Sequence, residues 1–180
     1  MKTNSRTIAA IAIAGALCLS PAFAASSLKP SDTKFLKDAA QGGMAEVELG
    51  RLAAQKASSA DVKAFGQRMV DDHSKANDQL KSLASQKGVT LPTGMKADAK
   101  AMEAKLSKLS GADFDKMYMH HMHVDHTQDV AEFKKEASKG GDSDVRAFAK
   151  TTLPTLEEHL KMAKSLDKTG KTASKSSKKG

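Results

Sequence analysis

Cysteine, tryptophan and long apolar runs are scarce in this sequence, and each shortage narrows the chemistry open to it. The 180 residues contain one Cys, one Tyr and no Trp. The single cysteine, Cys18, lies in a segment that we expect to be removed, which leaves no disulfides and no thiolate ligands. Beyond that segment, no apolar run approaches the roughly 20 residues of a membrane helix. Metal chemistry in the remaining chain therefore depends on His, Met and carboxylate side chains.

The motifs of nucleophilic catalysis and phosphate binding are also missing. The sequence has no Gly-x-Ser-x-Gly elbow and no Gly-rich phosphate loop. Its formal net charge is +8, but no aromatic residues interleave the basic ones, so we expect no specific nucleic-acid binding. Much of that charge lies in a Lys- and Ser-rich stretch at 169–180, which predicts a disordered tail.

Residues 1–24 have the organisation of a secretory signal peptide. Lys2 and Arg6 give a positive start, residues 8–19 are apolar, and an Ala-Phe-Ala cleavage signal ends at Ala24. The apolar run is too short to span a membrane. We therefore expect cleavage after Ala24 and an exported protein, most simply a periplasmic one.

Apolar residues recur at helical spacing through the rest of the chain, and turn residues divide it into segments. The expected helices cover about 35–56, 61–87, 96–109, 114–138 and 144–166, with Ser31 or Asp32 capping the first. Short turns join the first two and the last two long helices, which predicts antiparallel neighbours. The expected fold, over 25–168, is an all-α four-helix bundle of two antiparallel helical hairpins. The shorter helix lies in the connection between the hairpins, which is long enough for a crossover.

An internal repeat supports this arrangement. The sequence DVKAF at 61–65 matches DVRAF at 144–148, and each follows a predicted hairpin turn. A second pair of similar stretches, MVDDH at 69–73 and MHVDH at 122–126, lies midway along two of the long helices. The chain therefore reads as two related hairpins packed together.

One polar residue falls on the apolar face of each long helix, at a similar distance from the hairpin turns. These residues are Glu46, His73, His126 and His159. Buried polar groups must be satisfied, so they either hydrogen-bond one another or bind a metal ion. Imidazole with carboxylate suits Fe, Mn, Zn or Cu. Asp72 and Asp125 stand next to His73 and His126, where they are candidates to orient the ligands.

The stretch MYMHHMHVDH supports a different metal site. Met119 with His123, and Met122 with His126, are spaced four residues apart, and His120 is three residues before His123. Thioether with imidazole is a ligand set for Cu(I). The alternative is that the methionines are adaptable core residues and that His120 and His123 face solvent.

Several stretches between Phe35 and Leu166 resemble the bacterial domain of unknown function 4142 family. They are GGMAEVELGRLA at 42–53, MVDDH followed by SKAN at 69–77, SGADFDKMYM at 110–119, VDH at 124–126 and TLPTLEEHL at 152–160. The family is similar to ferritin-like four-helix proteins, and its members are typically exported. The resemblance therefore implies a ferritin-like bundle and an exported protein, and no settled activity.

A ferritin-like dimetal centre would need two Glu and two Glu-x-x-His motifs. Here Val70, His123 and Leu156 stand three residues before the inward-facing histidines, and only Glu46 matches a carboxylate position. The resemblance to ferritin-like proteins therefore does not imply an oxidase or iron-storage activity for this chain.

Three functional hypotheses follow from these observations. The first is an exported bundle that binds a transition metal through Glu46, His73, His126 and His159. The second is a non-catalytic envelope or stress-associated interaction module whose buried His and Glu form a metal-free network. The third is an enzyme that carries out redox chemistry at a bound metal, which would need an open coordination position.

Overall fold

The computed structural model describes residues 28–176, which form five α-helices and the segments that join them. Their bounds are α1 (Pro30–Lys56), α2 (Ala60–Gln86), α3 (Ala97–Leu106), α4 (Gly111–Lys139) and α5 (Ser143–Ser176). No strand occurs within the described range, and the prediction of an all-α helical bundle is confirmed. The predicted signal peptide at 1–24 lies outside the described residues.

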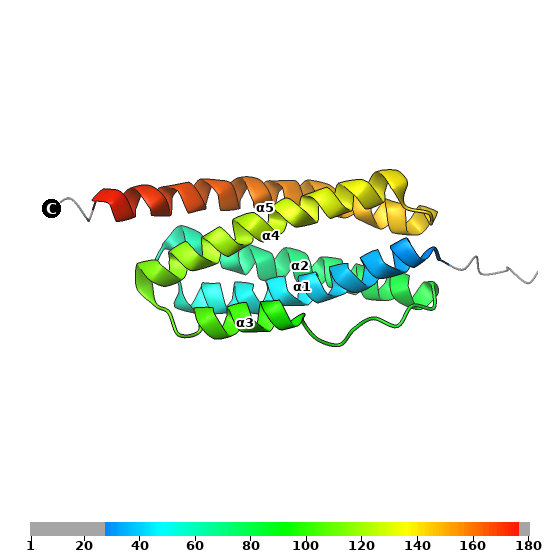
Figure 1. Ribbon diagram of the computed structural model, residues 1–180, viewed down its shortest axis with the longest axis horizontal. Coiled ribbons are helices and arrows are strands. Elements are labelled where there is room, and N and C mark those ends of the chain that lie inside the picture. The colour runs from blue at the N-terminus through cyan, green and yellow to red at the C-terminus, as the bar shows by residue number, and fades with distance from the viewer. Residues whose placement is uncertain (1–27, 177–180) are drawn as a thin grey trace, which may run out of the picture.

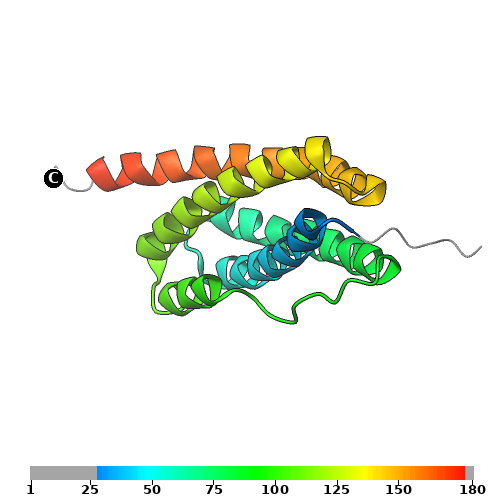
Figure 2. The same ribbon diagram turned by 45° about the vertical axis from the view of Figure 1, so that its right-hand side comes forward.

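The four long helices are arranged in two layers (Figures 1 and 2). α1 packs mainly against α2, and α4 packs mainly against α5. Contacts of α2 with α5 and of α1 with α4 hold the layers together. The connection after α2 runs back along the outside of the first layer to α3, so that α4 begins at the end of the bundle where α2 begins (Figure 1). α2 and α4 therefore run in the same direction, as in bundles that contain a crossover connection.

The start of α1 differs from the prediction. The helix begins at Pro30, because proline has no amide hydrogen and a fixed φ that suits the first helical position. Ser31 and Asp32 are therefore both inside the helix, and neither caps it. The buried carboxylate of Asp32 instead accepts hydrogen bonds from the backbone N–H of Gly141 and Asp142, at 3.1 and 2.7 Å, in the turn between α4 and α5.

The other hairpin turn is held in the same way. Asp115 of α4 accepts hydrogen bonds from the backbone N–H of Ser58 and Ser59, at 2.9 and 2.8 Å, in the turn between α1 and α2. Each helix pair thus contributes one carboxylate that binds the turn of the other pair. These paired contacts fix how far one layer slides along the other, and so help to set the level of residues in the middle of the bundle.

Two glycines allow α1 and α2 to approach closely. A Cβ atom on Gly66 would lie 2.8 Å from the carbonyl oxygen of Gly50, and one on Gly50 would lie 2.7 Å from the carbonyl oxygen of Gly66. Backbone atoms cannot move aside as a flexible side chain can, so any larger residue at these positions would push the helices apart.

The core consists of two apolar clusters, one toward each end of the bundle. The first includes Leu49, Phe65, Met69, Phe114, Tyr118, Met119 and Met122. The second includes Phe35, Leu36, Leu80, Val130, Phe133, Val145 and Leu156. Along every long helix, the predicted polar core residue falls between a member of one cluster and a member of the other. The polar groups therefore lie in a layer between two apolar regions.

The last helix is longer than predicted. It runs through Pro154 without a break and continues past Leu166 to Ser176. Part of the predicted tail at 169–180 is therefore helical, and 177–180 lie outside the described residues. None of the helices between residues 28 and 176 has a stretch both long and apolar enough to cross a bilayer.

Candidate metal centre

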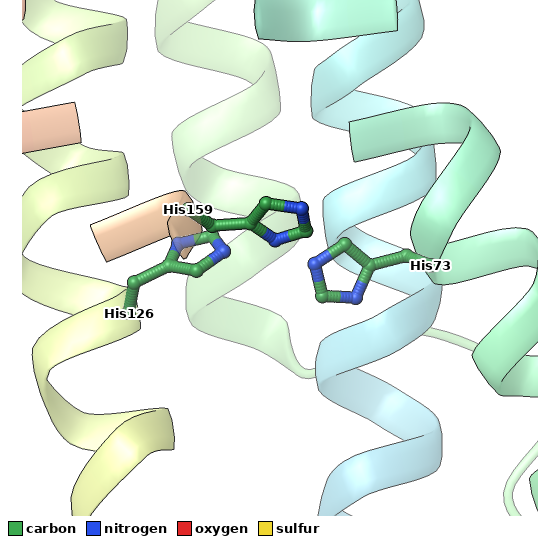
Figure 3. A group of neighbouring side chains, drawn as sticks. All are labelled: His73, His126 and His159. Atoms are coloured by element: carbon green, nitrogen blue, oxygen red, sulfur yellow. The ribbon is translucent and has the colours of Figure 1, made fainter. Parts of the chain in front are cut away.

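Three histidines from three helices meet in the middle of the bundle. Figure 3 shows the imidazole rings of His73 (α2), His126 (α4) and His159 (α5) pointing toward one another. Their ring centroids are 5.3–5.7 Å apart, and one nitrogen from each ring lies within 4.8 Å of the other two. Two imidazole nitrogens bound to one ion at about 2.0–2.1 Å are at most about 4 Å apart, so small side-chain rotations would close this group on an ion.

His126 is held by its own helix. Its Nδ1 lies 3.0 Å from the carbonyl oxygen of Met122, one turn earlier on α4. Because a carbonyl only accepts hydrogen bonds, Nδ1 carries the proton and Nε2 keeps its lone pair. Nε2 is buried and has no hydrogen-bond partner among the described residues. The ring is therefore fixed in the tautomer that a metal ion requires.

His159 is held by a carboxylate from another helix. Its Nε2 lies 2.8 Å from Oδ2 of Asp72 on α2, and its buried Nδ1 has no partner among the described residues. Asp72 is itself held by Arg68, whose Nε lies 3.2 Å from the same oxygen. Burial by itself would raise the pKa of Asp72, but the hydrogen bonds from His159 and Arg68 lower it. Asp72 is thus a charged acceptor that leaves the lone pair of His159 on Nδ1.

His73 lies nearest to solvent. Its side chain is buried, and its Nε2 has no hydrogen-bond partner within the described part of the chain. A cleft of about 140 Å³ between α2 and α5 is lined by His73 and Asp72, with Thr151, Thr152 and Thr155 on the opposite side. Water and small ligands therefore have a route to this member of the group.

Burial keeps the three imidazoles neutral. Desolvation lowers the pKa of His73 well below its usual range, and the neighbouring His126 and His159 lower it further. Desolvation, with a contribution from His159, lowers the pKa of His126 to about 4. Desolvation also lowers the pKa of His159, although its contact with Asp72 opposes that shift. Close to neutral pH the ring nitrogens without partners are therefore unprotonated and available as ligands.

Glu46, the fourth predicted ligand, lies beside the three histidines and not among them. Its fully buried Oε1 is 3.8 Å from Nδ1 of His126, the nitrogen whose proton is donated to Met122. Glu46 instead groups with Asp125 and Asp129 of α4, with one oxygen from each carboxyl within 4.8 Å of the others. The reason is the packing of α1 against α4, which places Glu46 against the helix that carries these two acids.

Little positive charge lies near the carboxyl groups of Glu46, Asp125 and Asp129. Burial, followed by the charge of Asp125, raises the pKa of Glu46 well above its usual range. Burial, with Asp125 and Glu132, raises the pKa of Asp129 to about 8, although Lys96 opposes that shift. Neither oxygen of Glu46 has a hydrogen-bond partner among the described residues.

The methionine and histidine stretch on α4 is divided between core and surface. Met119 and Met122 are buried in the first apolar cluster, as the core interpretation predicts. His120 is exposed, and His123 is half-buried with its Nδ1 3.0 Å from Oδ2 of Asp167 on α5. The helix thus directs the thioethers and these two imidazoles to different surroundings, and does not gather them into one copper site.

Sequence reasoning missed two residues near the histidines. Asp129 follows Asp125 by one helical turn, and that spacing was the available signal that the two acids share one face of their helix. Arg68 precedes Asp72 by one turn, the spacing of a helical ion pair. Asp72 was expected to lie near His73, but its carboxylate reaches across to His159.

The chain matches the family model described as a domain of unknown function (DUF4142) over residues 18–166, and it belongs to that family. No curated protein matches the sequence significantly. Among solved structures, a DUF305 fragment from Deinococcus radiodurans is similar, with a TM-score of 0.68 and 13% identity over 77% of this chain and 96% of that one. CopM in the Cu(II)-bound form is also similar, with a TM-score of 0.65 and 15% identity over 77% of this chain and 96% of that one. At these identities the likeness concerns the fold alone.

Proposed function

We propose that this member of the DUF4142 family binds a divalent transition metal ion in the core of its bundle, with His73, His126 and His159 as ligands. The observation that carries the proposal is the convergence of three neutral imidazoles, each with a buried nitrogen that has no partner among the described residues. A buried polar atom left without a hydrogen bond costs about 1–3 kcal/mol. A metal ion would satisfy all three nitrogens together.

The surroundings of the three histidines support metal binding over a hydrogen-bonded network. Three neutral imidazoles offer one proton each, and two of those protons are already donated, to Met122 and to Asp72. The nitrogens that remain on these two rings are acceptors, so they cannot hydrogen-bond each other. The contacts with Met122 and Asp72 are also the kind that orient metal-binding histidines in other proteins.

The chemistry of the ligands narrows the choice of metal. Imidazole suits Zn, Cu, Fe and Ni, whereas ions such as Ca²⁺ and Mg²⁺ prefer oxygen. The fold is similar to that of CopM, whose structure was solved with Cu(II), so copper and zinc are the first ions to test. Three protein ligands leave a coordination position for water or another small ligand, and the cleft beside His73 gives access to it.

We also propose that the protein works outside the cytoplasm. The positive start, the apolar run at 8–19 and the Ala-Phe-Ala signal ending at Ala24 support cleavage after Ala24. Cell fractionation followed by N-terminal sequencing tests this proposal directly. A protein that starts at Ala25 in the periplasmic fraction supports it, and an uncleaved protein in the cytoplasmic fraction contradicts it.

Elemental analysis of protein purified without an affinity tag tests the metal proposal. We expect close to one equivalent of bound Cu or Zn per chain after incubation and removal of free metal. We expect a loss of that equivalent in His73→Ala and His159→Ala, with circular dichroism to check folding. His120→Ala is the matched control, since its exposed imidazole lies on the surface of α4.

The competing hypothesis, a metal-free network that only fixes the packing of the helices, predicts the opposite pattern. The purified protein would then take up no stoichiometric metal. His73→Leu would raise the melting temperature, because an apolar side chain would replace a buried polar one in a bundle core. That combination of results would contradict metal binding.

A further inference from the structure

An acidic cleft lies on the side of the bundle away from the opening beside His73. It has a volume of about 240 Å³ and is formed by α1, α4 and the start of α3. Five carboxylates line it, from Asp38, Asp98, Asp125, Asp129 and Glu132. Of the described residues lining the cleft, only Lys96 carries a full positive charge, and it pairs with Asp38 at 3.0 Å. The cleft therefore attracts cations.

The inner end of this cleft leads to Glu46. Asp125 and Asp129 line the cleft and are half-buried, and one oxygen of each lies within 4.8 Å of an oxygen of Glu46 behind them. The Glu46 side chain is fully buried, and neither of its oxygens has a hydrogen-bond partner among the described residues. A buried carboxyl group without a hydrogen-bond partner is costly, and a cation bound between Glu46 and the cleft would offset that cost.

A second polar group near Glu46 also lacks a partner. The hydroxyl of Tyr118 on α4 is buried and makes no hydrogen bond within the described part of the chain. It lies close enough to Glu46 for the two to interact electrostatically. Glu46 and Tyr118 are thus two buried oxygen-bearing groups without partners among the described residues.

We propose that Glu46, Asp125 and Asp129 form a second cation site that takes a hard divalent ion such as Ca²⁺ or Mn²⁺. The ligand atoms are all oxygens, which these ions prefer over nitrogen or sulfur. Oxygens bound to one Ca²⁺ at about 2.3–2.6 Å are at most about 5 Å apart, a limit that the observed 4.8 Å spacing meets. One ion between the three oxygens would hold all three carboxylates together.

This carboxylate site is separate from the three histidines, although the two are neighbours. Glu46 approaches His126 on the Nδ1 side, at 3.8 Å. The nitrogen of His126 without a partner, Nε2, is on the opposite part of the ring. An ion held by the histidines and an ion held by the carboxylates would therefore use different sides of His126, and each site is complete without the other.

Terbium luminescence tests this site on the whole protein. Tb³⁺ binds oxygen ligands as Ca²⁺ does, and it emits when energy is transferred from a nearby tyrosine. The sequence has one Tyr and no Trp, so we expect emission excited through an aromatic ring to report on Tyr118, which lies on α4 with Asp125 and Asp129. We expect sensitised emission that saturates at one Tb³⁺ per chain and is displaced by Ca²⁺ or Mn²⁺.

Matched variants show whether the three carboxylates hold the ion. Asp129→Asn should weaken Tb³⁺ binding about tenfold or more, because it removes one of three charged ligands. Asp98→Asn removes an exposed carboxylate of the same cleft and should leave binding nearly unchanged. Tyr118→Phe should abolish emission while Ca²⁺ still raises the melting temperature. Circular dichroism confirms that each variant is folded.

Several results would overturn the proposal. These are an absence of saturable emission, an equal weakening by Asp98→Asn and Asp129→Asn, or emission that neither Ca²⁺ nor Mn²⁺ displaces. The histidine proposal is judged separately, since His73→Ala should leave Tb³⁺ binding within about twofold of the original protein. Loss of Tb³⁺ binding in that variant would contradict the separation of the two sites.

Discussion

The two polar clusters of this bundle lie at the same level but are built differently. In the histidine cluster, two of the three rings have one nitrogen held, by Met122 and by Asp72, and the other turned toward a common point. In the carboxylate cluster, Glu46, Asp125 and Asp129 face one another without a cation to separate them. The first cluster is arranged around neutral lone pairs, whereas in the second burial favours the protonated form of Glu46 and Asp129.

Burial alone therefore does not decide which ion a bundle core prefers. Both clusters are desolvated, but desolvation favours neutral imidazole in one and protonated carboxyl in the other. Neutral imidazoles can bind a transition metal without losing a proton, while a protonated carboxyl must lose one before it binds a cation. The histidine cluster is therefore prepared for its ion in advance, and the carboxylate cluster is not.

The largest expected effect is a separation of the two clusters by mutation. His159→Ala should weaken Cu or Zn binding by about 100-fold or more and leave Tb³⁺ binding unchanged, because it removes one of only three ligands. Asp129→Asn should have the reverse effect. Competition titrations with a chelator measure both affinities. If either variant loses both ions, the two clusters form a single site and the comparison fails.

The next largest effect is expected from weakening the hydrogen bond between His159 and Asp72. Asp72→Asn should weaken transition-metal binding by about 10–100-fold, since the asparagine no longer provides a charged acceptor for the Nε2 proton of His159. The matched control is Asp71→Asn, an exposed neighbour that bonds Gln67 on its own helix. Equal affinities for the two variants would mean that Asp72 does not orient the ligand.

A wider separation of α1 and α2, which hold members of both clusters, should destabilise the bundle. Gly66→Ala should lower the free energy of unfolding by about 1–3 kcal/mol, since the new Cβ meets the backbone of α1. Gly42→Ala is the control, because a Cβ there has no neighbour within 4 Å and should add up to about 1 kcal/mol through helix propensity. Urea denaturation measures both, and a stabilised Gly66→Ala would show that α1 and α2 are not in tight contact.

The smallest effect is a pH dependence of the metal-free protein. The pKa of Asp129 is raised to about 8, so the folded state binds a proton more tightly than the unfolded state, and stability falls as pH rises toward 8. The pKa of His126 is lowered to about 4. Its contribution to the stability of the folded state is therefore lost only as the pH falls below 6.5, the ordinary pKa of histidine. His73 and His159 follow His126, with pKa values shifted in the same direction.

Between pH 6.5 and 8 the raised carboxyl pKa values therefore dominate. We expect the melting temperature to fall by a few degrees across this interval, and Asp129→Asn to remove most of that fall. Thermal unfolding in the presence of a chelator measures it. A melting temperature that rises from pH 6.5 to 8 would mean that the carboxyls are not desolvated.

The helical period was enough to predict which side chains face the core. His73, His126 and His159 each fall on an apolar stripe, and their distances from the hairpin turns place them at one level, as the structure shows. Periodicity does not say which neighbour a core residue meets. The carboxyl of Glu46 does point inward, but the packing of α1 against α4 places it against Asp125 and Asp129.

Contacts between side chains of different helices could not be predicted from the sequence either. Asp72 stands at the edge of its stripe, and only the position of α5 shows that it reaches His159. Ser31 or Asp32 was predicted as a helix cap from its residue type, whereas a turn far along the chain provides the partners of Asp32. In each case the local sequence pattern predicts where the residue lies on its helix, and tertiary packing determines which residue it contacts.

Anomalous diffraction from crystals grown with copper or zinc tests the central claim most directly. We expect one peak enclosed by His73, His126 and His159, at about 2.0–2.1 Å from one nitrogen of each ring. A peak elsewhere, for example beside His120 and His123 with none between the three rings, would contradict it.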